Sequence, residues 1–321
     1  MSDRVDDEET YYHVDGEVVA RADATVSVDD RGFRYGDAAF ETCRAYGGTV
    51  FRWERHRERL RETCATLGMA DAVPGDLAAR VDETLAANDL ADAYVRVSVS
   101  RGVQPGKLTP AREVDPTVVV YVSPLPRGGV DGEPVWDDAA VVQSVATRRP
   151  PESVLPPGAK THNYLNGILA RLELRDGGAS RSAESATEAP DGQAERSPDQ
   201  PADEALQCDV EGRVAEGATS NLFFVDDGVL KTPAEGSILP GITREVVLEL
   251  AREEALPVET GGYRLADLRS ADEAFLTNTT WEVRPVASID GVEIGGGEVT
   301  AVLRRRYREL VEARCYGEAP G

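Results

Sequence analysis

Lysine is nearly absent from this 321-residue sequence, since only three of its 35 basic residues are lysine. There are also only three histidines and four cysteines, with no Cys-x-x-Cys pair and no spacing typical of a metal site. No apolar run reaches the roughly 18–20 residues that span a bilayer, and the acidic start is unlike a signal peptide. We therefore expect no metal, no membrane span, free thiols and a cytoplasmic location.

The charge of the chain is strongly one-sided. There are 58 acidic residues against 35 basic ones, which gives a formal net charge of −23. Such a surface repels nucleic-acid phosphates and anionic membranes, so both classes of partner are excluded. An acidic, lysine-poor surface suits a protein that works in molar salt, where the Debye length is about 3 Å. A merely acidic protein from an ordinary environment is the alternative.

Two stretches of the chain have the composition of breaks between folded parts. Residues 124–129 read Pro-Leu-Pro-Arg-Gly-Gly, which is typical of a linker. Residues 177–203 contain no Val, Ile, Leu, Phe, Tyr or Trp, so they cannot bury enough apolar area to offset their ordering entropy. We predict an N-terminal domain over 1–124 and a C-terminal domain over 125–321, with a disordered insertion at 177–203.

Both halves of the chain mix strand and helix patterns. Residues 94–100 alternate polar and apolar side chains, as a half-buried strand does. Residues 163–175 predict a helix whose buried stripe holds Leu165, Leu169 and Leu172. Further helices are predicted over 54–67, 77–85, 243–255 and 299–314, and further strands over 11–28, 117–122, 138–146 and 273–277. Residues 222–230 predict a hairpin that turns at Asp227-Gly228. This mixture predicts an α/β or α+β fold in two lobes.

One of the three lysines, Lys160, lies in a turn rich in proline and glycine just before a predicted helix. A turn fixed by prolines can hold an amine in place, and a partly desolvated lysine loses its proton and becomes a nucleophile. An ordinary solvated lysine would produce the same pattern. Position alone therefore leaves both interpretations open.

Two other segments have the chemistry of an anion site. Pro240-Gly241 precedes a helix that begins near Thr243, and the free N–H groups of a helix N-terminus bind phosphate. Small polar residues at 277–280 end a predicted strand. A capped helix and a polar loop would look the same. Neither a Walker lysine motif nor GxGxxG is present.

Taken in order, the motifs of this chain resemble those of the class IV aminotransferase family, the fold-type IV enzymes that use pyridoxal 5′-phosphate. The family includes branched-chain and D-amino-acid transaminases and 4-amino-4-deoxychorismate lyase. The resemblance covers nearly the whole chain, and the insertion departs from it away from every motif. The matching segments are 31–37 with Phe40-Glu41, 56–60, Lys160 with 163–165, Glu216-Gly217 with 220–223, 239–244, and 271–273 leading to 284–286.

The resemblance implies a two-domain fold-type IV architecture and a role for each matching residue. Lys160 bonds covalently to pyridoxal 5′-phosphate and moves the substrate's α-proton. Glu216 faces the pyridine nitrogen, and Tyr164 reaches the phenolic oxygen. The phosphate is bound by Arg59, by the backbone N–H groups of Ile242 and Thr243, and by Thr279. The family also implies a homodimer in which the cofactor lies between the domains and the neighbouring subunit closes the pocket.

Within the family, two details of the sequence favour the lyase branch. Asn278-Thr279 stands where branched-chain transaminases usually have Gly-Thr, and Ser100-Arg101-Gly102 ends the alternating strand. These details favour a lyase that releases pyruvate from aminodeoxychorismate to give 4-aminobenzoate. A transaminase for branched-chain or other amino acids with a 2-oxo acid acceptor is the alternative. A non-catalytic interaction protein on the same fold is disfavoured, because it would not need Lys160, Glu216 and Arg59.

Overall fold

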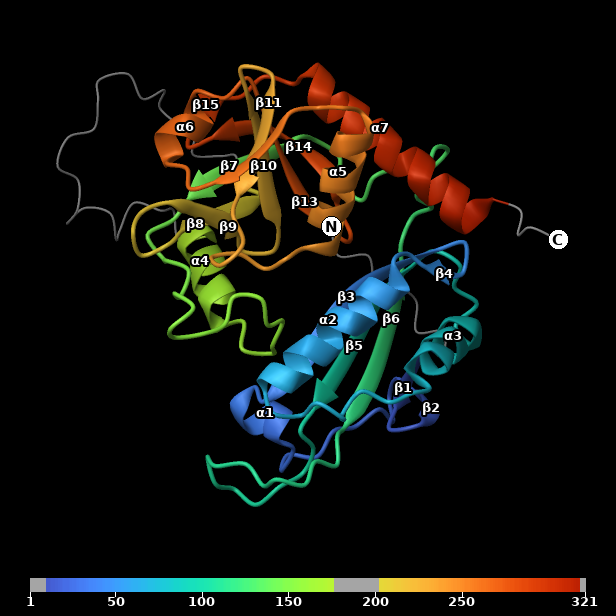
Figure 1. Ribbon diagram of the computed structural model, residues 1–321. Helices are drawn as coiled ribbons and strands as arrows, with labels where there is room; N and C mark the ends of the chain where they lie inside the picture. The colour runs from blue at the N-terminus through green and yellow to red at the C-terminus, as the bar shows by residue number, and fades with distance from the viewer. Residues whose placement is uncertain (1–9, 176–201, 318–321) are drawn as a thin grey trace. The chain divides into compact units, whose positions relative to one another are not determined.

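A computed structural model describes residues 10–175 and 202–317 (Figure 1). The described chain divides into two compact units of mixed α/β structure, as the sequence predicted. The first unit holds the described parts of 1–133 and 310–321 together with 159–163, and the second holds 134–158 and the described part of 164–309. All but the last two residues of the predicted insertion lie outside the described residues. None of the described helices is both long and apolar enough to cross a membrane.

The first unit is built on one antiparallel sheet with the strand order β2-β1-β6-β5-β3-β4. Two helices pack on one face of this sheet, and a short helix precedes β3 (Figure 1). The strands are β1 (Tyr11–Val14), β2 (Glu17–Ala20), β3 (Ala38–Tyr46), β4 (Thr49–Val50), β5 (Ala93–Ser100) and β6 (Val118–Pro124). The helices are α1 (Arg31–Tyr35), α2 (Trp53–Thr66) and α3 (Leu77–Ala87).

The predicted alternation in β5 is confirmed and sorts the two faces of this sheet. The side chains of Val95, Val97 and Val99 are buried in one cluster with residues of α2 and α3. Because side chains alternate along a strand, Arg96 and Ser98 point to the opposite face. The helix-covered face is the hydrophobic core of the unit, so the opposite face is available for polar chemistry.

The segment that carries Lys160 pairs with β3, far away in sequence. Phe40 N–H donates to Lys160 O at 2.9 Å, and His162 N–H donates to Ala38 O at 2.9 Å. An isolated bridge between Ala39 and Thr161 continues the pairing. These bonds group residues 159–163 with the first unit, whereas the predicted boundary near residue 124 put them in the C-terminal domain. The difference arises because backbone pairing between distant segments leaves no local pattern.

The second unit contains a nine-stranded sheet with the order β12-β11-β10-β13-β14-β7-β8-β9, with β15 paired to β14. Its strands are β7 (Ala140–Ser144), β8 (Glu204–Cys208), β9 (Val214–Gly217), β10 (Asn221–Asp226), β11 (Val229–Pro233), β12 (Val258–Gly261), β13 (Glu273–Asn278), β14 (Glu282–Ile289) and β15 (Val292–Glu293). Its helices are α4 (Leu165–Arg175), α5 (Ile242–Glu253), α6 (Leu265–Arg269) and α7 (Glu298–Val311). The chain continues from α7 into a π-helical turn, Glu312–Tyr316, whose residues belong to the first unit.

The prediction that the leucine stripe of α4 is buried is wrong. Leu165 is 59% exposed and Leu169 is 40% exposed, and Ile168 beside them is 54% exposed. The helix packs instead through Ala170, which is buried in a cluster with Val145 and Ala205. Helical spacing identifies an apolar stripe, but it does not tell whether anything in the same chain covers that stripe.

Candidate functional site

The backbone of Lys160 is anchored to two elements of the first unit. Its N–H donates to Thr63 Oγ1 on α2 at 3.1 Å, and its carbonyl accepts from Phe40 on β3. The Lys160 Nζ lies 4.5 Å from the centroid of the Phe40 ring. Strand and helix together therefore fix the point from which this amine extends.

Arg59 lies on α2 one turn before Thr63, which places it beside the anchored Lys160 segment. Its Nε and Nη2 donate to the two carboxylate oxygens of Glu41, each at 2.7 Å. His56 Nδ1 is 2.8 Å from the same carboxylate. Burial alone would raise the pKa of Glu41, but the charge of Arg59 and the hydrogen bonds from Arg59 and His56 lower it to about 2. Glu41 and His56 belong to two separate sequence motifs, and no local pattern predicts that they meet in this cluster.

The low pKa of Glu41 predicts a loss of stability in acid. An ordinary glutamate with a pKa of 4.5 binds a proton in the unfolded chain before the folded Glu41 does. The contribution of Glu41 is therefore complete above pH 4.5 and is lost as the pH falls towards 2, amounting to about 3 kcal/mol. Urea unfolding at pH 7, 5 and 3 in constant salt will measure it. The Glu41→Gln variant should lose this part of the pH dependence, and an unchanged dependence would contradict the assignment.

Arg96 is a second functional candidate that sequence reasoning missed. Its guanidinium carbon lies 3.8 Å from the centroid of the Phe40 ring, the ring that Lys160 also approaches. His162 packs against the same ring and lies 3.1 Å from Ser98 Oγ. Burial, with a smaller effect of Arg96, lowers the pKa of His162 to about 4, so this ring is neutral at pH 7. His162 therefore adds no positive charge beside Phe40, whereas the guanidinium of Arg96 does.

Glu216 is held by three donors of the second unit. Arg149 Nη2 donates to Oε1 at 2.7 Å, and Asn221 Nδ2 donates to Oε2 at 3.0 Å. The Leu239 N–H lies 3.1 Å from both oxygens. Charge-assisted hydrogen bonds of this kind fix the orientation of a buried carboxylate and stabilise its negative charge. Arg149 carries no sequence signal that could have revealed this contact.

The start of α5 has the features of an anion site. Its N-cap residue, Gly241, supplies no side-chain cap to this 12-residue helix, so the N–H groups of Ile242 and Thr243 can bind a ligand. A Cβ at Gly241 would lie 1.9 Å from Asn221 Oδ1, so only glycine allows this close approach. Thr277 is the cross-strand partner of Asn221, and its buried Oγ1 has no hydrogen-bond partner within the described residues.

Asn221 connects this helix start to Glu216. Its Nδ2 donates both to Glu216 and to the carbonyl of Leu239, two residues before Gly241. Thr279 follows the end of β13, two residues beyond Thr277. The Glu216 carboxylate and the start of α5 are therefore connected by one amide side chain in the second unit.

Tyr164 directly precedes α4, which closely approaches the segment after Glu216. A Cβ at Gly167 would lie 3.3 Å from Ala218 O and 3.7 Å from the Tyr164 ring. Asn166 Oδ1 accepts from Gln207, the cross-strand partner of Glu216. These contacts place Tyr164 beside β8 and β9, and β9 carries Glu216.

The predicted site residues form two groups, one in each unit. Lys160 and Arg59 lie in the first unit, and Tyr164, Glu216, Ile242, Thr243 and Thr279 lie in the second. An amine, a helix end open to a phosphate and a buried carboxylate for a pyridinium are the groups that pyridoxal 5′-phosphate requires. The orphaned Thr277 hydroxyl beside the Gly241 turn adds one further polar group, so the residues fit this cofactor. No cluster of His, Cys, Asp and Glu in residues 10–175 and 202–317 could hold a metal.

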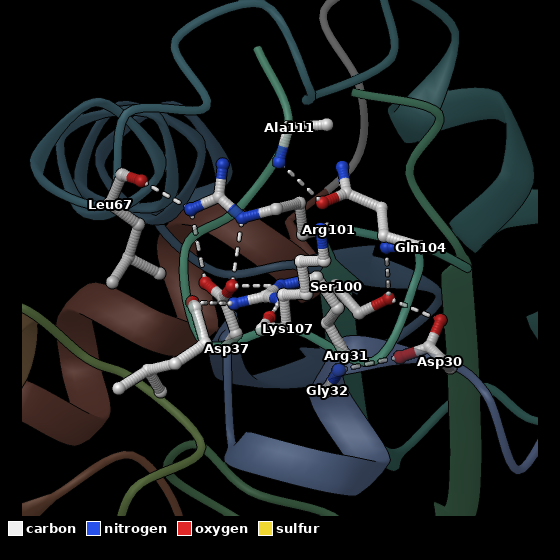
Figure 2. A network of polar contacts seen from close by, with 12 residues as sticks. Asp30, Arg31, Gly32, Asp37, Leu67, Ser100, Arg101, Gln104, Lys107 and Ala111 are labelled. Atoms are coloured by element: carbon white, nitrogen blue, oxygen red, sulfur yellow. Dashed lines mark hydrogen bonds and ion pairs between the residues drawn. The ribbon is translucent and has the colours of Figure 1, made fainter. Parts of the chain in front are cut away.

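The residues that favoured a lyase have structural roles. Figure 2 shows Arg101 bonded to both oxygens of Asp37, at 2.8 and 3.1 Å, and to the carbonyl of Leu67. Ser100 Oγ donates to Asp30 at 2.7 Å in the same network. Asn278 Oδ1 accepts from backbone N–H groups of the following turn. These contacts explain the residues without reference to a substrate, so they no longer support the lyase.

The same network holds a loop against α1. Asp37 also accepts from Arg31 Nε at 2.8 Å. Arg31 Nη1 and Nη2 donate to the carbonyls of Lys107 and Leu108 at 2.7 and 2.9 Å (Figure 2). The backbone at Lys107 is therefore fixed although its side chain is exposed.

Comparison with known proteins gives a consistent result. The family model for class IV amino-transferases matches residues 38–182 and 194–289. A protein of Methanocaldococcus jannaschii described as a branched-chain-amino-acid aminotransferase is 37% identical over 93% of this chain and 95% of its own. An aminodeoxychorismate lyase of Bacillus subtilis is 30% identical over 94% of both chains.

Among solved structures, the branched-chain aminotransferase of the archaeon Thermoproteus uzoniensis with norvaline superimposes with a TM-score of 0.79 at 30% identity. The alignment covers 95% of this chain and 95% of that one. Another branched-chain aminotransferase, 29% identical with a TM-score of 0.80, is complexed with N-(5′-phosphopyridoxyl)-L-glutamate. These findings favour the transaminase alternative over the lyase.

Proposed function

Because this chain belongs to the class IV aminotransferase family, which uses pyridoxal 5′-phosphate, we propose that it is a transaminase for branched-chain or similar amino acids with a 2-oxo acid acceptor. The observation that carries the proposal is the pair of basic side chains on one ring. Lys160 Nζ and the Arg96 guanidinium lie 4.5 and 3.8 Å from the centroid of Phe40. An amine for proton transfer and a fixed cation for a carboxylate are what both an amino acid and a 2-oxo acid need.

The remaining residues bind and orient the cofactor in this proposal. When bound, pyridoxal 5′-phosphate withdraws electrons from the α-carbon of the substrate. The proposed ligands of its phosphate are Arg59 from the first unit and, from the second, Thr279 and the N–H groups of Ile242 and Thr243. Glu216 places a negative charge against the ring nitrogen, and Tyr164 donates to the phenolic oxygen.

Lys160 and Arg96 act on the substrate. Arg96 binds a carboxylate of the amino acid and so orients its α-carbon towards Lys160. Lys160 removes the α-proton and returns it at a different carbon, which a proton carrier on a mobile side chain can do. The same two residues then serve the 2-oxo acid in the reverse direction.

The need for a 2-oxo acid acceptor distinguishes the proposed transaminase from the lyase. With leucine alone, we expect the purified enzyme to release no more 2-oxo acid than one equivalent of its bound cofactor. Adding 2-oxoglutarate should start multiple turnovers, because only an acceptor regenerates the cofactor. A coupled assay with each substrate will measure both. Repeated formation of 4-aminobenzoate from aminodeoxychorismate without a 2-oxo acid would favour the lyase instead.

We further propose that the protein is a homodimer and that the exposed stripe of α4 contributes to its interface. Leu165, Ile168 and Leu169 lie one turn apart, so they form one apolar helix face. The adjoining predicted insertion has no large apolar residue that could cover this face. In the proposed dimer, a second copy of the chain supplies the apolar surface that covers this face of α4.

Charge placed on this stripe should break the dimer. The Ile168→Glu variant is expected to shift the mass measured by light scattering from dimer to monomer, because a buried unpaired charge costs several kcal/mol. We propose molar KCl as the working condition, given the net charge of −23. Val292→Glu is the control, since Val292 is 40% exposed on β15, away from α4. A dimer that persists in the Ile168 variant would remove α4 from the interface.

A further inference from the structure

Glu41 is a buried carboxylate that has no part in the steps above. It is 1% exposed on β3, and it accepts hydrogen bonds from Nε and Nη2 of Arg59 at 2.7 Å each. His56, one turn before Arg59 on α2, contacts the same carboxylate at 2.8 Å. A bidentate pair of this kind fixes the plane of a guanidinium as well as its position.

The charges within this cluster cancel. Glu41 is anionic at pH 7 because its pKa is lowered to about 2. Burial lowers the pKa of His56, so the ring is neutral and its Nδ1–H donates to Glu41. Glu41 therefore neutralises Arg59. A phosphate that binds here is recognised mainly by the direction of the Arg59 N–H groups. The net charge of the Arg59–Glu41 pair contributes only weakly.

We propose that Glu41, supported by His56, is a positioning residue that fixes Arg59 for the cofactor phosphate. The inference rests on the phosphate-binding role proposed above for Arg59. With Nε and Nη2 both bonded to Glu41, the third nitrogen, Nη1, is held in one direction pointing away from that carboxylate. The cluster is buried, and salt screens buried charges far less than exposed ones. Phosphate recognition of this kind is preserved in molar salt.

Long-range electrostatics alone predicts the opposite effect of removing Glu41. Loss of a negative charge near a dianionic phosphate should strengthen binding. Loss of a positioning partner should weaken it, because the guanidinium no longer has one orientation. Glu41→Gln removes the charge and keeps the size of the side chain, so the sign of the change distinguishes the two effects.

The full-length protein freed of its cofactor can be titrated with pyridoxal 5′-phosphate and with pyridoxal, which lacks the phosphate. The ratio of the two affinities isolates phosphate recognition, whereas a general loss of structure weakens both ligands alike. We expect Arg59→Gln and Glu41→Gln each to lower this ratio by between about 10- and 100-fold. In the double variant, Glu41→Gln should add nothing to Arg59→Gln.

Asp37→Asn provides a matched control for the loss of an acid that is paired with arginine, since the Asp37 side chain is only 13% exposed. Asp37 is paired with Arg31 and Arg101 in the same unit, whereas Glu41 is paired with Arg59. This variant should lower the midpoint of thermal unfolding and leave the affinity ratio unchanged. A reduced ratio in this control would mean that the measurement reports stability.

The remaining outcomes distinguish the phosphate-binding role of Arg59 from the positioning role of Glu41. An unchanged ratio in Arg59→Gln would overturn the proposed role of Arg59 itself. A lowered ratio in Arg59→Gln with an unchanged or raised ratio in Glu41→Gln would overturn the positioning role alone. If circular dichroism shows that Glu41→Gln does not fold, Glu41→Asp keeps the charge but draws the guanidinium out of place. That variant must also lower the ratio, and an unchanged value would refute the inference.

Discussion

Replacing Lys160 by alanine is expected to abolish transamination, with kcat falling at least about 10³-fold. The proposal requires this amine to bond to the cofactor and to carry the α-proton, and neither of the other two lysines lies in the segment that pairs with β3. Lys160→Arg should be equally inactive, because a guanidinium does not give up its proton in proteins. Steady-state rates with leucine and 2-oxoglutarate will measure both variants.

The two other lysines are matched controls for this prediction. Lys107 is exposed, and Lys231 forms an ion pair with Asp226 at 2.7 Å. Lys107→Arg and Lys231→Arg should retain wild-type rates. Borohydride treatment of the holoenzyme should fix the cofactor to the peptide that contains Lys160. Labelling of either other lysine would show that the assignment is wrong.

Replacing Glu216 by glutamine is expected to lower kcat by about 10²- to 10³-fold, the usual effect of removing a preorganised charge from an active site. The amide cannot place a negative charge against the ring nitrogen. Its NH₂ group would also face Arg149, Asn221 or the Leu239 N–H, all of which are donors. Single-turnover absorbance changes will separate this chemical step from cofactor binding.

A surface carboxylate of the same unit serves as the control. Glu211 is 63% exposed and paired with Arg213, so Glu211→Gln should have no effect on rate. Arg149→Gln, which removes one of the donors to Glu216, should reduce kcat less than Glu216→Gln does. A Glu216→Gln enzyme with wild-type kcat would exclude this carboxylate from the chemistry.

Much of the fold could be predicted because its signals are local. The strand alternation in β5 and the Asp227-Gly228 turn between β10 and β11 depend on neighbouring residues, and both predictions are confirmed. The buried stripe of α4 was wrong, because burial depends on what packs against a helix. The pairing of residues 159–163 with β3 likewise depends on a partner more than a hundred residues away.

The site residues divide in the same way, into those with a local sequence signal and those that depend on distant contacts. Lys160 could be found because lysine is scarce and because its surroundings match a family motif. Arg96 and Arg149 could not, since each is one arginine among many and its role depends on Phe40 or Glu216 across the fold. Glu41 did leave a signal. It is a charged residue within β3, a strand that is otherwise almost entirely buried.

The fixed loop at Lys107 has a practical consequence for handling the protein. Amine-directed reagents find few side chains in a chain that uses arginine almost everywhere, and bound cofactor occupies Lys160 in the proposed holoenzyme. Lys231 is engaged with Asp226, which leaves Lys107 as the most accessible lysine. Because Arg31 holds the backbone there, a dye or a surface linker attached to Lys107 would report from a rigid position. Lys107 thus offers a rigid attachment point for immobilisation without an engineered cysteine.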